Sequence, residues 1–461
     1  MKKPLIIIGG GLSGLAAAIR FARYSTEVLL LEKHNKIGGL NSYYFRNKML
    51  LETGLHAITN YAGAEEKHAP LNKLFRQLKL SRKNFVTHPQ ICSEIHFSDR
   101  KNLIFSNDFQ LLCDEIATKF PSSRKGFTEL VKEIRQFDPF IPLPYRSAKK
   151  FVFQYVQDEL LTDMLLCPLM YYGSSVENDL DLSQFVIMFR SIYLEGMFRP
   201  EGDIKTFLDM LLAHYKKLGG AIRLSASVTK ILHQNNMVHG LELNNGEQIE
   251  CDNIISTIGV DETKALLGQT ADHTADTRLG FIESIFLLEK DKNYSPPEDR
   301  TIIFYNQGKK FNYCRPESVV DINSGVICFP ANFQGRSEQR FYEIRSTHLS
   351  SYPEWLDKAK NTEQYQENKA KVAEASLAVL ERFAGKFRHL IVYNDTFTPL
   401  TIKKYTSKID GAIYGSPAKI KDGDIGFNNL FIAGTDQGFL GIIGSMLSGV
   451  SMVNRHILPK I

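Results

Sequence analysis

The fold is decided by the stretch LIIIGGGLSGLAAAIR at residues 5–20 and by VLLLE at residues 28–32. An apolar run is followed by three glycines, an alanine-rich segment and a second apolar run that ends in Glu32. This order predicts a strand, a tight turn, a helix and a second strand. In such a unit the helix N-terminus offers free N–H groups and a positive dipole to phosphates. The sequence therefore predicts an α/β fold with a Rossmann-type dinucleotide site.

Each glycine of this turn has a mechanical role. We expect Gly9 to allow the sharp turn out of the strand and Gly11 to let the backbone approach a pyrophosphate. Gly14 would let the helix pack closely on the strand. Glu32 follows Gly14 by about 18 residues, close to the ~20 residues at which a carboxylate binds ribose hydroxyls. The residues that the turn would present to a cofactor are Gly9, Gly11, Leu12, Ser13 and Gly14. An ordinary strand–turn–helix corner is the alternative.

A further glycine pair, Gly38-Gly39, distinguishes between dinucleotides. NAD-dependent dehydrogenases do not generally need such a pair after the ribose acid, whereas flavoproteins resembling glutathione reductase and the amine oxidases carry one. The pair lets a loop pass close to the pyrophosphate and the ribityl chain. We therefore favour FAD as the cofactor and expect Lys33 and Leu40, which flank this loop, to lie beside it. A simple turn after the second strand is the alternative.

The composition excludes several classes of protein. With 461 residues, 43% of them hydrophobic, the chain is long enough for two or three domains with a sizeable core. The net charge of +5 is mild, and no basic stripe with interleaved aromatic residues indicates a nucleic-acid partner. The six cysteines have no CxxC or zinc-like spacing, and the sequence contains no HExxH motif, no clustered metal ligands and no Ser-His-Asp arrangement. We therefore expect no metal, and neither a hydrolase nor a metalloenzyme.

The expected location is the cytoplasm, and peripheral contact with the inner face of a membrane stays open. No apolar run reaches the ~18 residues of a membrane-spanning helix. The cysteine usage fits a reducing compartment. The mild positive charge is compatible with attraction to an anionic membrane surface.

The succession of patterns predicts a discontinuous dinucleotide-binding domain with two insertions. Residues 1–90, 201–270 and 391–461 would form a glutathione reductase-like FAD-binding domain. Residues 91–200 would form a helical region facing the substrate or a membrane. Residues 271–390 would add an antiparallel sheet and a helix. Together the two insertions would make an α+β substrate domain.

Local patterns mark elements inside these domains. Asn245-Gly246 between alternating apolar segments predicts a β-hairpin. Residues 362–384 are long, charged and followed by Gly385, which predicts a helix and its end. The aromatic and apolar stretches at residues 151–173 and 185–198 either form core or line an apolar tunnel, and the sequence favours core.

Over nearly its whole length the chain resembles the phytoene desaturase, carotenoid isomerase and retinol saturase group of FAD-dependent oxidoreductases. The more specific features are the Thr-Pro and Gly-Ala-Ile-Tyr-Gly segments within residues 394–415 and the glycine-rich end at residues 431–449. Two positions depart from the pattern of the group. Asp203 stands where the group often has a glycine. The turn at residues 434–436 is shifted by a residue or two relative to the group's pattern. Other segments that carry the resemblance are residues 9–14, 32, 38–39, 52–56, 197–202 and 219–228.

The resemblance implies further contacts with the cofactor. Gly54 and Leu55 would run beside the isoalloxazine. Val228 would hold the adenine through its backbone, unless it is an ordinary strand valine. A helix beginning at Ile442 would point its N-terminus at the flavin N1–C2=O edge, where N–H groups stabilise the negative charge of reduced flavin. Asp436 would bind the ribityl chain. The implied cofactor site also includes His56, Thr257, Gly434, Gly441 and Ile443.

Two side chains are candidates for catalysis. His56 follows the turn at Gly54, which suits proton transfer beside the flavin, and a neutral hydrogen-bonded loop histidine is the alternative. Arg199 would orient a polar end group of the substrate or balance the charge of the flavin. An arginine that is only a salt-bridge partner is the alternative reading of this residue.

The implied activity is that of an FAD-dependent oxidoreductase on C–C or C=C bonds of a long apolar polyene or isoprenoid lipid, with desaturation favoured. Carotenoid cis–trans isomerisation and saturase-like reduction on the same scaffold stay open, and the electron acceptor or donor is not assigned. A flavin- or lipid-binding protein without turnover is a hypothesis from another class. Amine oxidation usually relies on an aromatic cage at the flavin, and the single tryptophan, Trp355, is far in sequence from the cofactor motifs.

Overall fold

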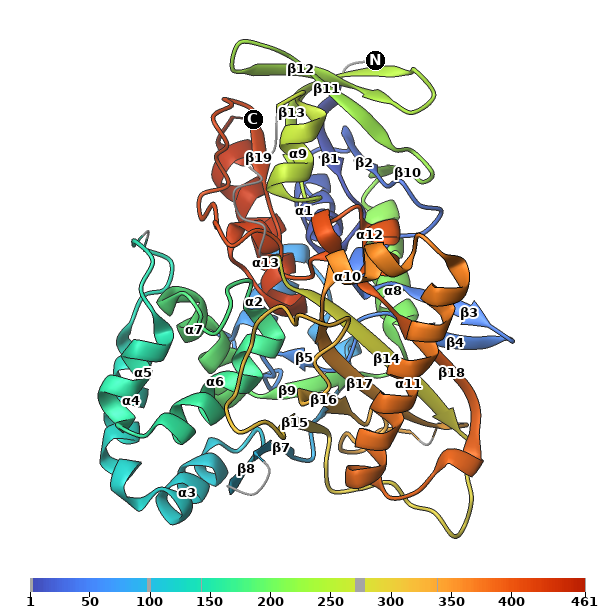
Figure 1. Cartoon of the computed structure of the whole chain (residues 1–461). Helices are drawn as coiled ribbons and strands as arrows, with labels where there is room; N and C mark the ends of the chain where they lie inside the picture. The colour runs from blue at the N-terminus through green and yellow to red at the C-terminus, as the bar shows by residue number, and fades with distance from the viewer. Residues whose placement is uncertain (1–2, 98–100, 142, 270–277, 338, 461) are drawn as a thin grey trace.

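The computed structural model describes residues 3–97, 101–141, 143–269, 278–337 and 339–460. Two large sheets organise these residues, each with seven strands. The upper sheet in Figure 1 lies near both ends of the chain, and the lower sheet is built mainly from the middle of the sequence. Helices flank both sheets, so the molecule has an upper and a lower lobe (Figure 1).

The upper sheet contains five parallel strands in the order β10-β2-β1-β13-β19. This is the strand order of a Rossmann-type fold. A meander extends it, because β11 pairs antiparallel with β12, and β12 with the start of β13. The strands come from three separate parts of the chain, which confirms the predicted discontinuous domain. They are β1 (Lys3–Ile8), β2 (Val28–Leu31), β10 (Ala221–Arg223), β11 (Val228–Gln234), β12 (Met237–Leu243), β13 (Gln248–Ser256) and β19 (Leu430–Ile432).

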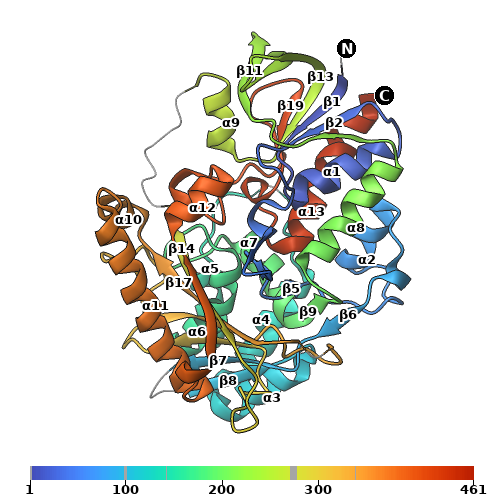
Figure 2. The same cartoon turned by 90° about the vertical axis from the view of Figure 1, so that its right-hand side faces the viewer.

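Side chains of the central strand β1 alternate between two apolar layers. Leu5 and Ile7 belong to a cluster shared with helices, whereas Ile6 and Ile8 belong to a cluster shared with the meander. Both faces of the sheet are therefore covered. The helical layer, at the right of Figure 2, consists of α1 (Leu12–Ala22), α2 (Pro70–Leu78), α8 (Ile204–Lys217) and α13 (Gly441–Met452), while α9 (Val260–Leu266) packs on the meander side.

The lower sheet has the strand order β18-β14-β17-β16-β15-β7-β8. Its neighbours pair antiparallel, except that β7 and β15 run parallel. The predicted antiparallel sheet of the substrate domain is thereby confirmed. The strands are β7 (Ser93–Phe97), β8 (Lys101–Phe105), β14 (Gly280–Leu288), β15 (Ile302–Asn306), β16 (Ser324–Cys328), β17 (Tyr342–Ser350) and β18 (Ile391–Phe397).

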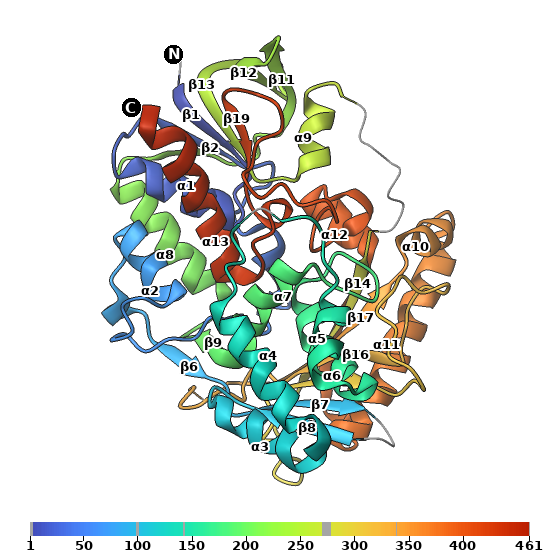
Figure 3. The same cartoon turned by 90° about the vertical axis from the view of Figure 1, so that its left-hand side faces the viewer.

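Helices cover the two faces of the lower sheet from opposite sides (Figure 3). Ile303 and Tyr305 of β15 pack in a cluster with α11, and Phe304 between them packs in a cluster with α6. The helices on the α11 side are α10 (Tyr352–Lys358), α11 (Thr362–Ala384) and α12 (Pro399–Thr406). The helical region on the other side contains α3 (Phe109–Lys119), α4 (Arg124–Gln136), α5 (Ala148–Val156), α6 (Glu159–Gly173) and α7 (Leu182–Phe189).

Two small sheets connect the lobes. One is the hairpin of β3 (Tyr43–Arg46) and β4 (Met49–Glu52). The other has β9 (Met197–Pro200) between β5 (Ile58–Thr59) and β6 (Thr87–Pro89). In this second sheet Ile58 pairs with Phe198, so the segment after Glu52 lies beside the segment around Arg199.

Local predictions agree with the structure, and one predicted domain limit does not. β12 and β13 form the hairpin at Asn245-Gly246, and α11 ends with Gly385 at its cap. Residues 391–397 are not part of the upper domain, because as β18 they pair with β14 in the lower sheet. The predicted limit between residues 270 and 271 lies outside the described residues. The other domain limits stay predictions.

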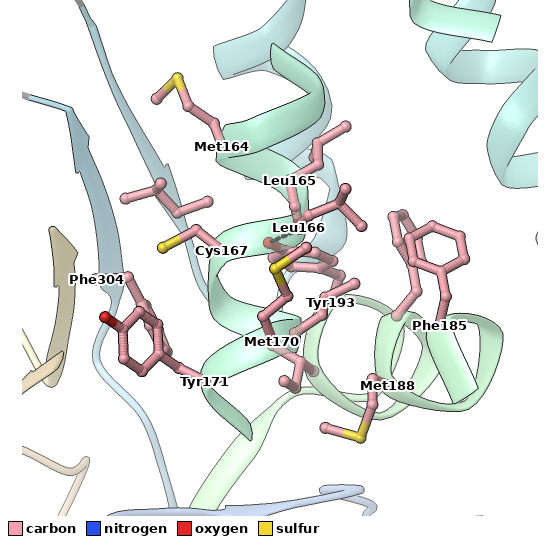
Figure 4. Close-up of a cluster of buried hydrophobic side chains, with 14 of the residues drawn as sticks. Met164, Leu165, Leu166, Cys167, Met170, Tyr171, Phe185, Met188, Tyr193 and Phe304 are labelled. Atoms are coloured by element: carbon pink, nitrogen blue, oxygen red, sulfur yellow. Dashed lines mark hydrogen bonds between the residues drawn. The ribbon is translucent and has the colours of Figure 1, made fainter. Parts of the chain in front are cut away.

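The aromatic and apolar stretches at residues 151–173 and 185–198 mainly form core. Figure 4 shows side chains of α6 packed against those of α7 and against Tyr193, whose hydroxyl donates to the carbonyl of Leu165 at 3.0 Å. Most of these side chains are buried against one another, so the core alternative holds for them. Tyr171 of α6 reaches the cavity described below.

The crossing of α1 and α13 depends on Gly449. A Cβ atom at this position would lie 2.0 Å from the backbone oxygen of Ser13, a contact that only a shift of one helix can relieve. We expect Gly449→Ala to destabilise the protein by about 1–3 kcal/mol and to lower the midpoint of thermal unfolding. Gly444→Ala in the same helix is the matched control, because its Cβ atom would meet the nearest backbone atom at 3.6 Å. Equal unfolding midpoints for the two variants would contradict this account of the crossing.

Candidate cofactor and active site

A cavity of about 1300 Å³ takes its wall from both lobes. Glu32, Gly39 and Gly441 line it from the upper lobe, and Tyr172 and Glu283 line it from the lower lobe. The cavity therefore joins the predicted cofactor site to the lower sheet in one continuous space.

The turn between β1 and α1 has the shape that a closely bound ligand requires. Gly9 has a φ of +103°, and a Cβ atom on it would lie 2.6 Å from Thr257 Oγ1. A Cβ atom on Gly14 would lie 2.0 Å from the backbone oxygen of Gly9, so the helix and the strand are in backbone contact. Gly11 is open by contrast, since the nearest atom to its Cβ position is 4.0 Å away. The three positions thus have the geometry of a turn, a packing contact and a free approach.

Helix α1 begins here with a polar group in need of a partner. The hydroxyl of Ser13 is buried and makes no hydrogen bond within the described residues. Leaving such a group unpaired costs about 1–3 kcal/mol, and a phosphate oxygen at the helix N-terminus would satisfy it. Leu12 is buried in the core, so it offers a ligand its backbone and not its side chain.

The loop with Gly38-Gly39 lies against this turn. Gly38 N donates to Gly10 O at 2.9 Å, and a Cβ atom on Gly39 would lie 3.3 Å from the Cα atom of Gly11. Gly39 and Leu40 line the cavity. The first glycine turn therefore lies directly against the loop that lines the cavity.

Glu32 holds its carboxylate at the cavity wall. Oε2 accepts a hydrogen bond from Gly10 N at 2.7 Å, and Oε1 accepts one from His34 N at 2.8 Å. Each oxygen keeps a lone pair for a ribose hydroxyl. Lys33 turns away, because its ammonium group donates to Ser407 and its side chain does not line the cavity.

The N-terminus of α13 faces the cavity. Gly441 and Ile442 line it, and Ser445 lines it one turn later. The first N–H groups of a helix have no partner within the helix and carry the positive end of its dipole. Negative charge on a ligand is therefore stabilised here. Ile443 points the other way and is fully buried in the upper core.

Asp436 does not lie at the cavity. Its carboxylate is buried and accepts hydrogen bonds from Val260 N at 2.7 Å and from Ser416 N at 2.8 Å. Its neighbour Thr435 lines the cavity instead. The structure thus offers Thr435 to a ligand, one residue before the position expected from the sequence.

Other predicted cofactor residues support the wall from behind. Thr257 Oγ1 donates to the carbonyl at the end of β1 at 3.0 Å, and Gly434 lies against α1. Leu55 is fully buried and Val228 packs within the meander as the first residue of β11, whereas Gly54 lines the cavity. The groups that do face the cavity fit a dinucleotide, because they supply a ribose acid, a glycine loop and the N-terminus of α13, and the first glycine turn lies against that loop.

The part of the cavity at the lower sheet is aromatic. Tyr171, Tyr172, Phe281 and Tyr414 line it. The rings of Phe281 and Tyr414 meet edge to face with 5.7 Å between their centroids. Trp355 is buried elsewhere in the lower lobe, with its indole N–H hydrogen-bonded there. The wall suits a flat or conjugated apolar chain, which aromatic faces and edges bind well.

His56 stands in the cavity wall at the end of a chain of buried charges. Its Nε2 atom lies 3.1 Å from Glu283 Oε2, and Arg345 Nη1 donates to Glu283 Oε1 at 3.1 Å. Arg345 also pairs with Glu343, and its Nη2 atom lies 3.9 Å from Glu52 Oε2. Burial lowers the pKa of Arg345, but the three carboxylates raise it overall, so the guanidinium is charged.

Arg199 does not reach the cavity, and its predicted catalytic role is corrected. Its side chain is 1% exposed and pairs with Glu52. Its Nη1 donates to the carbonyl of Leu55 at 2.9 Å and to that of His56 at 3.3 Å. Burial raises the pKa of Glu52, but Arg199 and Arg345 bring it below its ordinary value. The salt-bridge alternative therefore holds, and Arg199 supports the backbone of His56.

Glu283 and Arg345, two members of this chain of charges, were not identified from the sequence. Glu283 interrupts the otherwise apolar strand GFIESIFLL at residues 280–288, and all nine residues of that strand are buried. A charge in a fully buried strand is a signal for a functional or paired group. Arg345 lies in the buried part of β17, which is rich in polar residues, so its charge stands out less in the sequence. Thr435 carries no such signal, because a half-buried threonine in a turn is common.

Comparison with known proteins agrees with this geometry. The model of the flavin containing amine oxidoreductase family matches residues 12–284. The chain is 24% identical to 4,4'-diaponeurosporene oxygenase of Staphylococcus haemolyticus, covering 94% of this chain and 92% of that protein. It is 22% identical to all-trans-retinol 13,14-reductase of Danio rerio, covering 98% and 86% respectively. A solved oxidoreductase from Methanosarcina mazei shares the fold with a TM-score of 0.69 at 16% identity, over 99% of this chain and 100% of that one. The chain therefore belongs to the flavin-containing amine oxidoreductase family, with FAD as its cofactor.

Proposed function

We propose that the protein is an FAD-dependent oxidoreductase that acts on carbon–carbon bonds of a long apolar polyene or isoprenoid lipid, with desaturation as the favoured direction. The observation that carries this proposal is one cavity that joins Glu32, the Gly38-Gly39 loop and the start of α13 to an aromatic wall. The names of the two relatives, which specify diaponeurosporene and all-trans-retinol, support this class of substrate.

In this proposal the upper-lobe groups hold FAD. The turn with Ser13 and the Gly38-Gly39 loop bind the pyrophosphate, Glu32 binds a ribose, and the backbone of Val228 remains the proposed adenine contact. When bound, FAD supplies a hydride acceptor or donor. The N–H groups at the start of α13 stabilise negative charge at the flavin edge. The other proposed contacts are Gly9, Gly11, Gly14, Leu40, Gly54, Thr435, Gly441 and Ile442.

The lower-lobe groups align the substrate and move its proton. The tyrosine and phenylalanine rings bind the carbon chain and keep water from it. His56 takes a proton from the carbon next to the one that loses a hydride, or returns it in the reverse direction. A relative named as a reductase supports saturation as the second direction. Isomerisation, and lipid binding without turnover, are the remaining alternatives.

The activity is tested with a panel of carotenoids, retinoids and unsaturated isoprenoids under anaerobic conditions. We expect yellow protein whose flavin absorbance is bleached by a substrate of this class and by dithionite. Product mass then gives the direction: loss of two hydrogen atoms means desaturation, gain means saturation, and an unchanged mass with altered retention means isomerisation. Yellow protein that no member of the panel bleaches or converts would overturn the proposed substrate class.

The ribose contact is tested with Glu32→Ala. A lost hydrogen bond to a charged group is worth about 1.5–3 kcal/mol, so we expect FAD affinity to fall on the order of 10- to 100-fold. Glu27→Ala is the control, because Glu27 is an exposed glutamate just before β2. Affinity is measured by fluorescence titration of the apoprotein with FAD. Equal affinities for the two variants would show that Glu32 is not the ribose ligand.

We propose that the helical region contacts a membrane surface, from which a lipid substrate can enter. No helix in the part of the chain that the structure describes is long and apolar enough to cross a bilayer. Large apolar side chains are exposed before α5, with Phe140 at 60% and Ile141 at 53%. We expect a Phe140→Ser, Ile141→Ser variant to sediment with vesicles of mixed anionic and neutral lipid roughly tenfold less well. Leu356→Ser, at a position that is 50% exposed on α10, is the control.

A further inference from the structure

The ring of His56 is held by a carboxylate and its backbone by a guanidinium. Glu283 lies 3.1 Å from Nε2, and Arg199 donates to the backbone oxygen of His56 at 3.3 Å. Among the described residues no protein group is hydrogen-bonded to Nδ1. Because His56 lines the cavity, Nδ1 is the ring nitrogen available to a bound molecule.

The ionisation of Glu283 decides which ring nitrogen carries the hydrogen. Burial raises the pKa of Glu283, but the nearby His56 and Arg345 bring it below its ordinary value. The carboxylate is therefore ionised near neutral pH and can only accept hydrogen bonds. Nε2 must then donate, which leaves Nδ1 of the neutral ring with a free lone pair. The other groups around His56 are Glu52 and Arg199 in the same chain of charges, and Tyr172 beside it in the cavity wall.

We propose that Glu283 is a positioning residue that keeps the hydrogen of His56 on Nε2, so that Nδ1 exchanges a proton with the carbon chain of the substrate. This rests on the proposed function. In desaturation one C–H bond would break with its electron pair as a hydride, for which bound FAD would supply the acceptor. The adjacent C–H bond gives its proton to Nδ1, and its electron pair forms the C=C bond. In saturation Nδ1–H of the protonated ring returns the proton while the hydride comes from reduced FAD.

Arg345 fixes which groups donate and which accept in this arrangement. Its guanidinium carries only donors, so the group opposite it must present an acceptor. Glu283 satisfies both neighbours because each carboxylate oxygen accepts, one from Arg345 and one from His56. An amide at this position has one acceptor and one donor, and it cannot serve both neighbours in the same way.

The variant Glu283→Gln uses this constraint. Its amide oxygen must face Arg345, so its NH₂ group faces His56 and forces Nε2 to accept. The ring hydrogen then moves to Nδ1, and Nδ1 can no longer take a proton. We expect the rate at which substrate bleaches the flavin to fall on the order of 10²- to 10⁴-fold. Glu283→Asp keeps two acceptors, and we expect it to keep the parent tautomer and recover much of the rate.

The tautomer is read directly by ¹⁵N NMR of histidine-labelled protein without substrate, with the His56 signals assigned from His56→Gln. We expect hydrogen on Nε2 in the parent and in Glu283→Asp, and on Nδ1 in Glu283→Gln. Glu94→Gln is a matched control. Glu94 also lies between a histidine and an arginine, 3.0 Å from His96 Nδ1 and 2.8 Å from Arg300 Nε, but outside the cavity. We expect this control to change neither the His56 tautomer nor the bleaching rate.

Two results would overturn the inference: a Glu283→Gln variant that keeps hydrogen on Nε2, or one in which the hydrogen moves while the bleaching rate stays at the parental value. The NMR measurement needs no turnover. Failure of every polyene to bleach the flavin would therefore refute the proposed function, while the tautomer result would still decide the role of Glu283 at the ring.

Discussion

The contact on which the rest of the structure depends is the one between the backbones of Gly9 and Gly14. A side chain at the second position would start 2.0 Å from the oxygen of the first, so α1 can approach β1 only without one. This approach puts the N-terminus of α1 at the carboxyl edge of the sheet, where open α/β sheets bind ligands. Gly449 provides the same closeness between α13 and α1. The N-terminus of α13 faces the cavity and α1 starts beside the loop that lines it, because these positions carry no side chain.

Buried charged side chains lie between the lobes, and burying them costs free energy. Glu52, Arg199, Glu283 and Arg345 are almost inaccessible to water. Removing each ion from water costs several kcal/mol, and only pairing with good geometry offsets that cost. Apolar contacts would be tolerant of small displacements, whereas hydrogen-bonded pairs join β4 to β9 and β14 to β17 at specific atoms. A contact of 3.9 Å between Arg345 Nη2 and Glu52 Oε2 brings the two pairs together. We infer that this chain of charges sets the position of His56 relative to the flavin-binding loops.

The features that could be predicted from the sequence are those set by residues close together along the chain. The roles of Gly9, Gly11 and Gly14 follow from a few adjacent residues, and so does the hairpin at Asn245-Gly246. The partnership of His56 with Glu283 spans 227 residues and needs the two lobes to be assembled first. Thr435 lines the cavity in place of the predicted Asp436 because, in this tight turn, adjacent side chains point in different directions. Strand β18 was placed in the wrong domain because an edge strand has a half-buried pattern that either sheet would accept.

The place of α13 in the chain has a consequence for biogenesis. The phosphate turn is synthesised long before the helix that packs on α1, which comes from residues 441–452. Until those residues leave the ribosome, α1 lacks its neighbour and the cavity lacks the wall formed by Gly441 and Ile442. Cofactor loading is therefore a late event, and a nascent chain must shelter the apolar faces of its first sheet before any flavin can be retained.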